Sequence, residues 1–179
     1  RPPERLAHFD MMPKLATLPD GTMAAYFIEV RGPGLAPTPP VQDLKCRISK
    51  DSGRTWGELH SLFTFPSEEG GFGFHAVLVD RSGEVHFMLM NDANTGMLRA
   101  REPKPGRPAV ESRDKQRLDI WHVRSTDGRT KWTKPKQIWK GRVSDLQSAI
   151  QLASGRILLP FGDTVINRSW KTRGEGFGA

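Results

Sequence analysis

Charged and polar side chains gather at the ends of the strands that the sequence predicts, where loops of unequal length join them. Such ends can hold a polar ligand, because binding residues commonly lie on loops that a rigid scaffold positions. An arginine there can clamp a carboxylate, since the guanidinium matches it in geometry as well as in charge. The side chains at these ends are His8, Asp10, Glu29, Arg31, Asp43, His75, Asn91, Asp92, Asp119, Gln147, Asp163 and Arg168.

Each of these residues can also be a solvated loop residue or the cap of a local turn. Asp92 beside Asn91, and Asp163 near the end of the chain, are ordinary turn residues. His75 is harder to explain in this way. We expect it at the end of the first strand of its unit, the strand that would line a central channel, where a polar side chain has little structural use. His122 instead lies within a predicted strand, and we expect it to pack between sheets.

The elements that must position these side chains are organised around an octapeptide that occurs twice, as SKDSGRTW and as STDGRTKW. Ser, Asp and Trp keep their spacing in both copies. The pattern predicts a tight turn between two strands, in which Asp accepts hydrogen bonds from backbone N–H groups, Gly takes a positive φ and Trp seals the turn. Such a turn stabilises and does not catalyse. Its members are Ser49, Asp51, Gly53, Thr55 and Trp56 in the first copy, and Ser125, Asp127, Gly128 and Trp132 in the second.

Apolar runs and turn signals predict a unit of four strands that occurs twice and begins a third time. Gly21, Gly83 and Gly155 mark the first hairpin turn of each unit. The predicted strands span 11–18, 22–30, 43–49 and 57–65 in the first unit, 74–79, 84–91, 118–125 and 133–139 in the second, and 146–152 and 156–161 in the third.

The units differ by the length of one loop. Gly21 and Asp51 are 30 residues apart, whereas Gly83 and Asp127 are 44 residues apart. The extra length of the second interval equals the extra length of the loop at 92–117 over the loop at 31–42. Four-stranded antiparallel repeats of this kind favour an all-β fold, a β-propeller. A β-sandwich is the rival architecture, but it would not explain the paired octapeptides.

In the propeller interpretation the 179 residues form a single partial domain. Blade 1 lies at about 11–65, blade 2 at about 74–140 and part of blade 3 at about 146–179. Propellers have about 4 to 8 blades, so we expect this chain to be the N-terminal portion of a larger protein. It starts without an initiator Met or an apolar signal segment, which agrees with a processed or excised N-terminus.

Composition excludes several classes of site and partner. No run of 18 apolar residues exists, so we expect no membrane-spanning helix. The single Cys46 cannot form an internal disulfide and is expected to be a small buried hydrophobe. No zinc or haem spacing is present, so we expect no metal and no other cofactor.

The net charge of +7 is unevenly distributed. Between Arg99 and Arg142 there are 14 Lys plus Arg against 5 Asp plus Glu. Clustered cations can bind nucleic acid, but no Gly-rich phosphate loop, stacking-aromatic motif or recognition-helix pattern accompanies them. We therefore expect no nucleic-acid partner, and either a solvated loop or attraction for an anionic glycan.

The first octapeptide matches the Asp-box, S-x-D-x-G-x-T-W, and the second matches it with the glycine displaced. The chain thus resembles sialidases with bacterial neuraminidase repeats over nearly its whole length. Residues 117–139 look like the family's strand, box and Trp-ended strand, and residues 148–161 look like the segment that opens the next blade. The resemblance implies a six-bladed propeller, exo-α-sialidase activity on a glycan or glycoconjugate, no cofactor, and a secreted or periplasmic location.

Sialidases are similar to one another in an arginine triad that clamps the substrate carboxylate, an Asp acid/base and a Tyr/Glu nucleophile pair. Asp43 matches the place of the acid/base, which would protonate the glycosidic oxygen. The family's Arg-Ile-Pro motif reads Met11-Met12-Pro13 here, so its arginine is absent. The resemblance makes these residues candidates for substrate binding: Arg31, His75, Asn91, Asp92, Asp119, Gln147 and Arg168.

The nucleophile is not visible in this chain. The only tyrosine, Tyr26, lies in the middle of a predicted strand and is expected in the core. The nucleophile pair would come from later blades, so we expect these residues alone to hydrolyse nothing. Two alternatives remain open: a non-catalytic Asp-box propeller that binds glycan or protein, and another propeller glycosidase.

Overall fold

The computed structural model describes residues 13–31, 41–65, 71–92, 117–144 and 146–163. Within these ranges the chain is all-β: it forms strands joined by turns and contains no helix. Among the described residues there is accordingly no helix with the length and apolar character needed to span a membrane.

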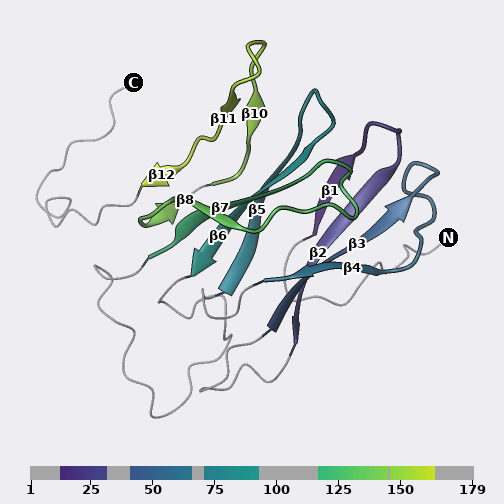
Figure 1. Cartoon of the computed structure of the whole chain (residues 1–179), viewed down its shortest axis with the longest axis horizontal. Coiled ribbons are helices and arrows are strands. Elements are labelled where there is room, and N and C mark those ends of the chain that lie inside the picture. Colours follow the sequence, from purple (N-terminus) through teal and green to yellow (C-terminus); the bar gives the residue numbers. More distant parts are fainter. Residues whose placement is uncertain (1–12, 32–40, 66–70, 93–116, 145, 164–179) are drawn as a thin grey trace, which may run out of the picture.

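Two four-stranded antiparallel sheets form the body of the structure (Figure 1). Neighbours in sequence are neighbours in each sheet, and each octapeptide connects the third strand to the fourth. The predicted antiparallel four-stranded units are therefore confirmed. The first sheet consists of β1 (Lys14–Thr17), β2 (Met23–Arg31), β3 (Val41–Ser49) and β4 (His60–Thr64). The second consists of β5 (Gly71–Val79), β6 (Val85–Asp92), β7 (Asp119–Ser125) and β8 (Lys136–Trp139).

The third unit is a hairpin that is interrupted along its length. Its outer pair joins β9 (Val143–Ser144) to β12 (Gly162–Asp163), and its inner pair joins β10 (Ile150–Gln151) to β11 (Ile157–Leu158). Both pairs are antiparallel, and their registers differ by two residues. The two long strands predicted at 146–152 and 156–161 are thus corrected to short ladder segments.

Several strand boundaries differ from the sequence prediction; β4 and β8, for example, start at His60 and Lys136 instead of at 57 and 133. β2 continues through Arg31 and β3 starts at Val41, so the loop between them is shorter than predicted. β5 begins at Gly71, although Gly71 and Gly73 weaken a strand. Phe72 between them is fully buried in the core, which favours the extended pairing with β6.

The second sheet is the middle of three layers. Side chains alternate across a strand, so Val85 and Phe87 of β6 face the first sheet while Met88 and Met90 face the third hairpin. The first core also contains Tyr26, Ile28, Leu44, Phe72 and Leu89. The second core contains Ala76, Leu118, Ile120, Val143 and Leu146.

The hairpin turns of the three layers meet at one end of the sheets, which we call the turn end. Arg129 of the second octapeptide donates from Nη2 to Asp20 Oδ2 at 2.6 Å and to Thr22 Oγ1 at 2.8 Å, in the turn between β1 and β2. Arg81, in the turn between β5 and β6, donates from Nη1 to the Ala153 carbonyl oxygen at 2.9 Å. Successive layers therefore have the same orientation.

Glycines at equivalent turns give a test of this stacking. Gly21 and Gly83 have φ of +80° and +87°, but a Cβ at Gly21 meets nothing within 4 Å, whereas one at Gly83 overlaps the Pro19 ring. We expect Gly21→Ala to lower the free energy of unfolding by about 1–2 kcal/mol, the cost of a left-handed residue. Gly83→Ala should lose about 1–3 kcal/mol more, because the layers must separate locally. Urea denaturation of both variants measures the difference, and equal losses would show that the turns do not touch.

Candidate functional site

The opposite end of the sheets, which we call the rim end, carries five of the predicted ligand-binding residues: Arg31, Asp43, Asn91, Asp92 and Asp119. There β2 ends and β3 begins in the first sheet, and β6 ends and β7 begins in the second. In the first sheet Arg31 of β2 is paired with Val41 of β3, and in the second sheet Asn91 of β6 is paired with Asp119 of β7. The two sheets thus present equivalent ends.

Asp43 is buried at the rim end and is held from both neighbouring strands. Its carboxylate accepts from Arg31 of β2, with Nε 2.5 Å from Oδ2, and from Thr64 of β4, with Oγ1 2.7 Å from Oδ1. Burial would raise the pKa of Asp43, but the hydrogen bonds from Arg31 and Thr64 and the charge of Arg31 outweigh it and lower the pKa. A second cross-strand ion pair, Glu29 with Lys45, lies beside the first.

This geometry limits what Asp43 can do as it stands. At neutral pH it is a carboxylate, which accepts hydrogen bonds or binds a cation but has no proton to donate. A general acid must hold a proton near the working pH. The role of Asp43 as acid/base therefore stays a prediction. To act as a general acid, Asp43 must first lose its contact with Arg31.

Asp119 and Asn91 are held inside the second sheet. Asp119 is fully buried, and its oxygens accept from Arg117, from Gln137 Nε2 at 2.7 Å and from the Gly141 N–H at 3.0 Å. Asn91 is fully buried and donates from Nδ2 to the Gly71 carbonyl oxygen at 3.4 Å. Both side chains are thus held by contacts within the protein, and their role in substrate binding stays a prediction.

His75 is not at a strand end, which corrects the sequence expectation. Because β5 begins at Gly71, His75 lies within the strand, at a β-bulge between Phe74 and Ala76. Its Nδ1 is 3.0 Å from the Leu146 carbonyl oxygen, so it connects the second sheet to the third unit. Burial lowers its pKa, and nearby Lys14 adds to the effect, which favours the neutral ring.

The remaining candidates are distributed along the chain. Gln147 is exposed next to the second core, and Asp92 and Asp163 are the last residues of β6 and β12. His8, Asp10 and Arg168 lie outside the described residues.

The two octapeptide turns have nearly the same hydrogen bonds. In the first, Asp51 accepts from Ser49 Oγ at 2.8 Å, and from the N–H and Oγ1 of Thr55 at 2.8 and 2.7 Å. The Trp56 indole N–H donates to the Gly53 carbonyl oxygen at 3.2 Å. The Thr55 hydroxyl, the Thr55 N–H and Ser49 together lower the pKa of Asp51 to about 2.

In the second turn Asp127 accepts from Ser125 Oγ at 2.9 Å, from the N–H groups of Arg129 and Thr130 at 2.9 Å each, and from Thr130 Oγ1 at 2.6 Å. The Trp132 indole donates to the Arg129 carbonyl oxygen at 3.1 Å. Partial burial raises the pKa of Asp127, but these donors outweigh burial and lower the pKa well below its usual range.

The second turn is also fastened to the first sheet. Tyr26 is fully buried and donates from its hydroxyl to the Gly128 carbonyl oxygen at 2.8 Å. Trp132 stacks on Phe87, with ring centroids 5.2 Å apart, and meets Tyr26 edge-on at 6.0 Å. The expectation that Tyr26 is a core residue is confirmed, and burial raises the pKa of its hydroxyl well above the usual value.

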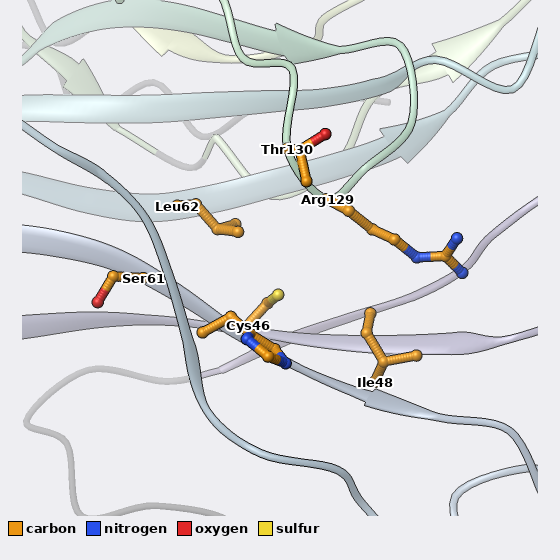
Figure 2. A pocket seen from close by; sticks show the side chains of 7 residues that line it. Cys46, Ile48, Ser61, Leu62, Arg129 and Thr130 are labelled. Atoms are coloured by element: carbon orange, nitrogen blue, oxygen red, sulfur yellow. The ribbon is translucent and has the colours of Figure 1, made fainter.

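A pocket of about 400 Å³ lies between β3 and β4 on one side and the second octapeptide turn on the other (Figure 2). It is lined by Cys46, Ile48, His60, Ser61, Leu62, Arg129 and Thr130. Burial raises the pKa of the Cys46 thiol to about 11, so at neutral pH it is protonated and a poor nucleophile. The guanidinium of Arg129 is bound to Asp20 and Thr22. The pocket lies nearer to the turn end and is separate from the predicted rim site.

A histidine pair was not anticipated from the sequence. His86 of β6 and His122 of β7 stack with ring centroids 5.3 Å apart, and His86 Nδ1 is 3.0 Å from His122 Nε2. Burial, and then the neighbouring His86, lower the pKa of His122 to about 4. The two residues lie on the same face of neighbouring strands, a relation that depends on the register of a pairing across a long loop.

Comparison with models of known protein families and with curated proteins finds no match to this chain.

The octapeptide aspartates predict an acid-labile contribution to stability. The folded pKa of Asp51 and of Asp127 lies below the usual value of about 3.9, so their contribution is present above that pH and is lost as pH falls toward the folded pKa. In Asp51→Asn plus Asp127→Asn, unfolding free energy should fall less steeply between about pH 5 and pH 3 than in the wild type. Urea denaturation across this range tests it, and identical slopes would contradict the account.

Proposed function

We propose that this chain forms part of an Asp-box β-propeller of the sialidase type. The observation that supports this best is that two octapeptide turns have corresponding hydrogen bonds at the same place in successive four-stranded sheets. Repeated four-stranded units that stack face to face, each oriented like the one before, are how propeller blades are built.

The outer layers of the stack supply a second argument. Ile150 and Leu158 lie opposite each other in the third hairpin, and the two residues are 52% and 39% exposed. Their neighbours Ile157 and Leu159 pack on the second sheet, so Ile150 and Leu158 face the other way. Repeat units bury their apolar faces only against further units, and we propose that another blade covers this pair.

For the activity, we propose hydrolysis of a glycoside that carries a carboxylate, as in exo-α-sialidases, with the rim end of the sheets as the binding face. The side chain of Arg31 is 58% exposed, whereas that of Asp43 is 6% exposed. An incoming carboxylate can therefore reach the guanidinium of Arg31 and compete with Asp43 for it.

That exchange would activate Asp43. The pKa of Asp43 is lowered mainly because Arg31 and Thr64 outweigh its burial. When the substrate carboxylate takes Arg31, the hydrogen bond and the charge of Arg31 are withdrawn while burial and the Thr64 hydrogen bond remain, so the pKa of Asp43 rises. Asp43 can then hold a proton and deliver it to the glycosidic oxygen as the bond breaks. The nucleophile would come from other blades.

The test is substitution of Asp43 in the complete protein. Asp43→Asn should lower kcat/KM for alkyl glycosides of an acidic sugar by about 10²–10⁴-fold, the usual contribution of a general acid. Aryl glycosides with good leaving groups should lose much less, because they need little protonation. Thr64→Val is the matched control, since it removes one hydrogen bond to Asp43 and leaves the carboxylate in place.

Two outcomes would count against the proposal. If Asp43→Asn and the wild type turn over alkyl glycosides equally, Asp43 is only a partner of Arg31. If both substrate types lose activity equally, Asp43 does not act as the acid.

A second candidate is a propeller that binds glycan or protein without cleaving it. It is favoured by the ion pair itself, because Asp43 is ionised and its oxygens are engaged. A complete protein that binds acidic glycans through Arg31 but cleaves no glycoside in a broad panel would establish it.

A further inference from the structure

Three side chains that commonly bind metals converge at the turn between β5 and β6. Asp80 precedes the turn, and Glu84 and His86 follow it two residues apart, which puts both on one face of the strand. One ligand atom from each residue lies within 4.8 Å of the others. His86 Nε2 is 3.5 Å from Asp80 Oδ2 and 4.0 Å from Glu84 Oε2.

His86 Nε2 supplies an independent observation. The side chain of His86 is 7% exposed, and Nε2 is a buried atom with no hydrogen-bond partner. The other ring nitrogen, Nδ1, is bound to His122 Nε2 at 3.0 Å. A buried polar atom without a hydrogen-bond partner destabilises the fold. This nitrogen faces two carboxylates, and a bound cation between them would satisfy it.

The spacing of these atoms fits a small cation. Around zinc, with ligands at 2.0–2.1 Å in a tetrahedron, neighbouring ligand atoms are about 3.3 Å apart. The 3.5 Å from His86 Nε2 to Asp80 Oδ2 is close to that value and long for a hydrogen bond, whereas Glu84, with Oε2 at 4.0 Å, must move closer to bind the same ion. The N–H of Ser82 and its Oγ, and the N–H of Glu84, donate to Asp80 Oδ1, so Oδ2 is the oxygen that faces His86.

We propose that Asp80, Glu84 and His86 bind a divalent transition-metal ion of the zinc type, with water in the fourth position. An imidazole with carboxylates suits zinc and its neighbours, whereas calcium and magnesium prefer oxygen ligands alone. His122 is a positioning residue, because its contact with Nδ1 fixes the ring of His86 as outer partners of metal-bound histidines do.

The charge around the site is compatible with a dication. Two carboxylates face it, and Arg124 donates from Nη1 to Glu84 Oε2 at 2.9 Å, the same oxygen that lies 4.0 Å from His86 Nε2. To bind the metal, the Glu84 carboxylate must turn so that Oε1 faces the ion while Oε2 keeps Arg124. The ion would connect the β5–β6 turn, through His86 and His122, to β7 (Figure 1). The site lies at the turn end, so we assign it a stabilising role.

The experiment is a Zn²⁺ titration of the whole chain after treatment with a chelator, followed by calorimetry and by thermal melting. We expect one Zn²⁺ per chain in the wild type and a Tm that rises with Zn²⁺ concentration. His86→Gln should weaken binding at least tenfold and abolish the shift in Tm. His122→Gln should weaken binding by about 10–100-fold, as loss of an outer partner does.

His60→Gln is the matched control, because His60 is an exposed histidine of β4 away from the cluster. It should bind Zn²⁺ as the wild type does. Asp80→Asn gives a second variant in case His86→Gln fails to fold, and it too should lose binding. The proposal is overturned if the wild type binds no Zn²⁺, or if it and the Asp80 and His86 variants bind equally.

Discussion

The hydroxyl of Tyr26 donating to the Gly128 carbonyl oxygen is the contact on which the arrangement of the layers depends. It runs from the second strand of the first sheet to the octapeptide turn of the second, inside a core closed by Trp132 on Phe87. A Cβ at Gly128 would lie 2.8 Å from Leu18 Cδ2, 2.9 Å from the Tyr26 hydroxyl and 2.9 Å from Val85 Cγ2. This crowding explains why glycine occupies that place in the second copy, where the first copy has Ser52.

The two ends of the stacked sheets differ in their contacts and in their suitability for binding a ligand. At the turn end, hairpin turns of successive layers touch and bond to one another, which makes that end rigid and structural. At the rim end lie two ion pairs, Arg31 with Asp43 across neighbouring strands and Arg117 with Asp119 within one segment at the start of β7. Only the first of these pairs has a well-exposed arginine, so an anionic ligand would compete most readily there.

The parts of the fold that rest on local chemistry could be predicted from the sequence. The octapeptide turns, the glycines of the hairpins and the strand order all follow from residues within a few positions of one another. The start of β5 could not, because Gly71 and Gly73 indicate a loop and only the burial of Phe72 against the other sheet reverses that preference. The position of Asp43 at the start of a strand was predictable, but its engagement by Arg31 and Thr64 depends on two cross-strand registers.

The burial of residues at the rim end could not be predicted from the sequence either. Asp119 is polar and near a strand end, yet its partners Gln137 and Gly141 come from β8 and the segment after it, which no local pattern relates to it. The cluster of Asp80, Glu84 and His86 is an intermediate case. The spacing of its residues is predictable from the sequence, since alternate residues of a strand share a face. That His86 Nε2 has no hydrogen-bond partner is evident only from the fold, in which His122 binds the other ring nitrogen.

We infer that the two sheets form one cooperative unit fastened by Tyr26. Native-state hydrogen exchange on Tyr26→Phe tests it most directly, with the amides of Ala24 in β2 and Phe87 in β6 as reporters. Leaving the Gly128 carbonyl oxygen without its donor should cost about 1–3 kcal/mol, and both amides should lose protection by the same factor. If only one of the two sheets loses protection, or neither does, the sheets are independent and the account is wrong.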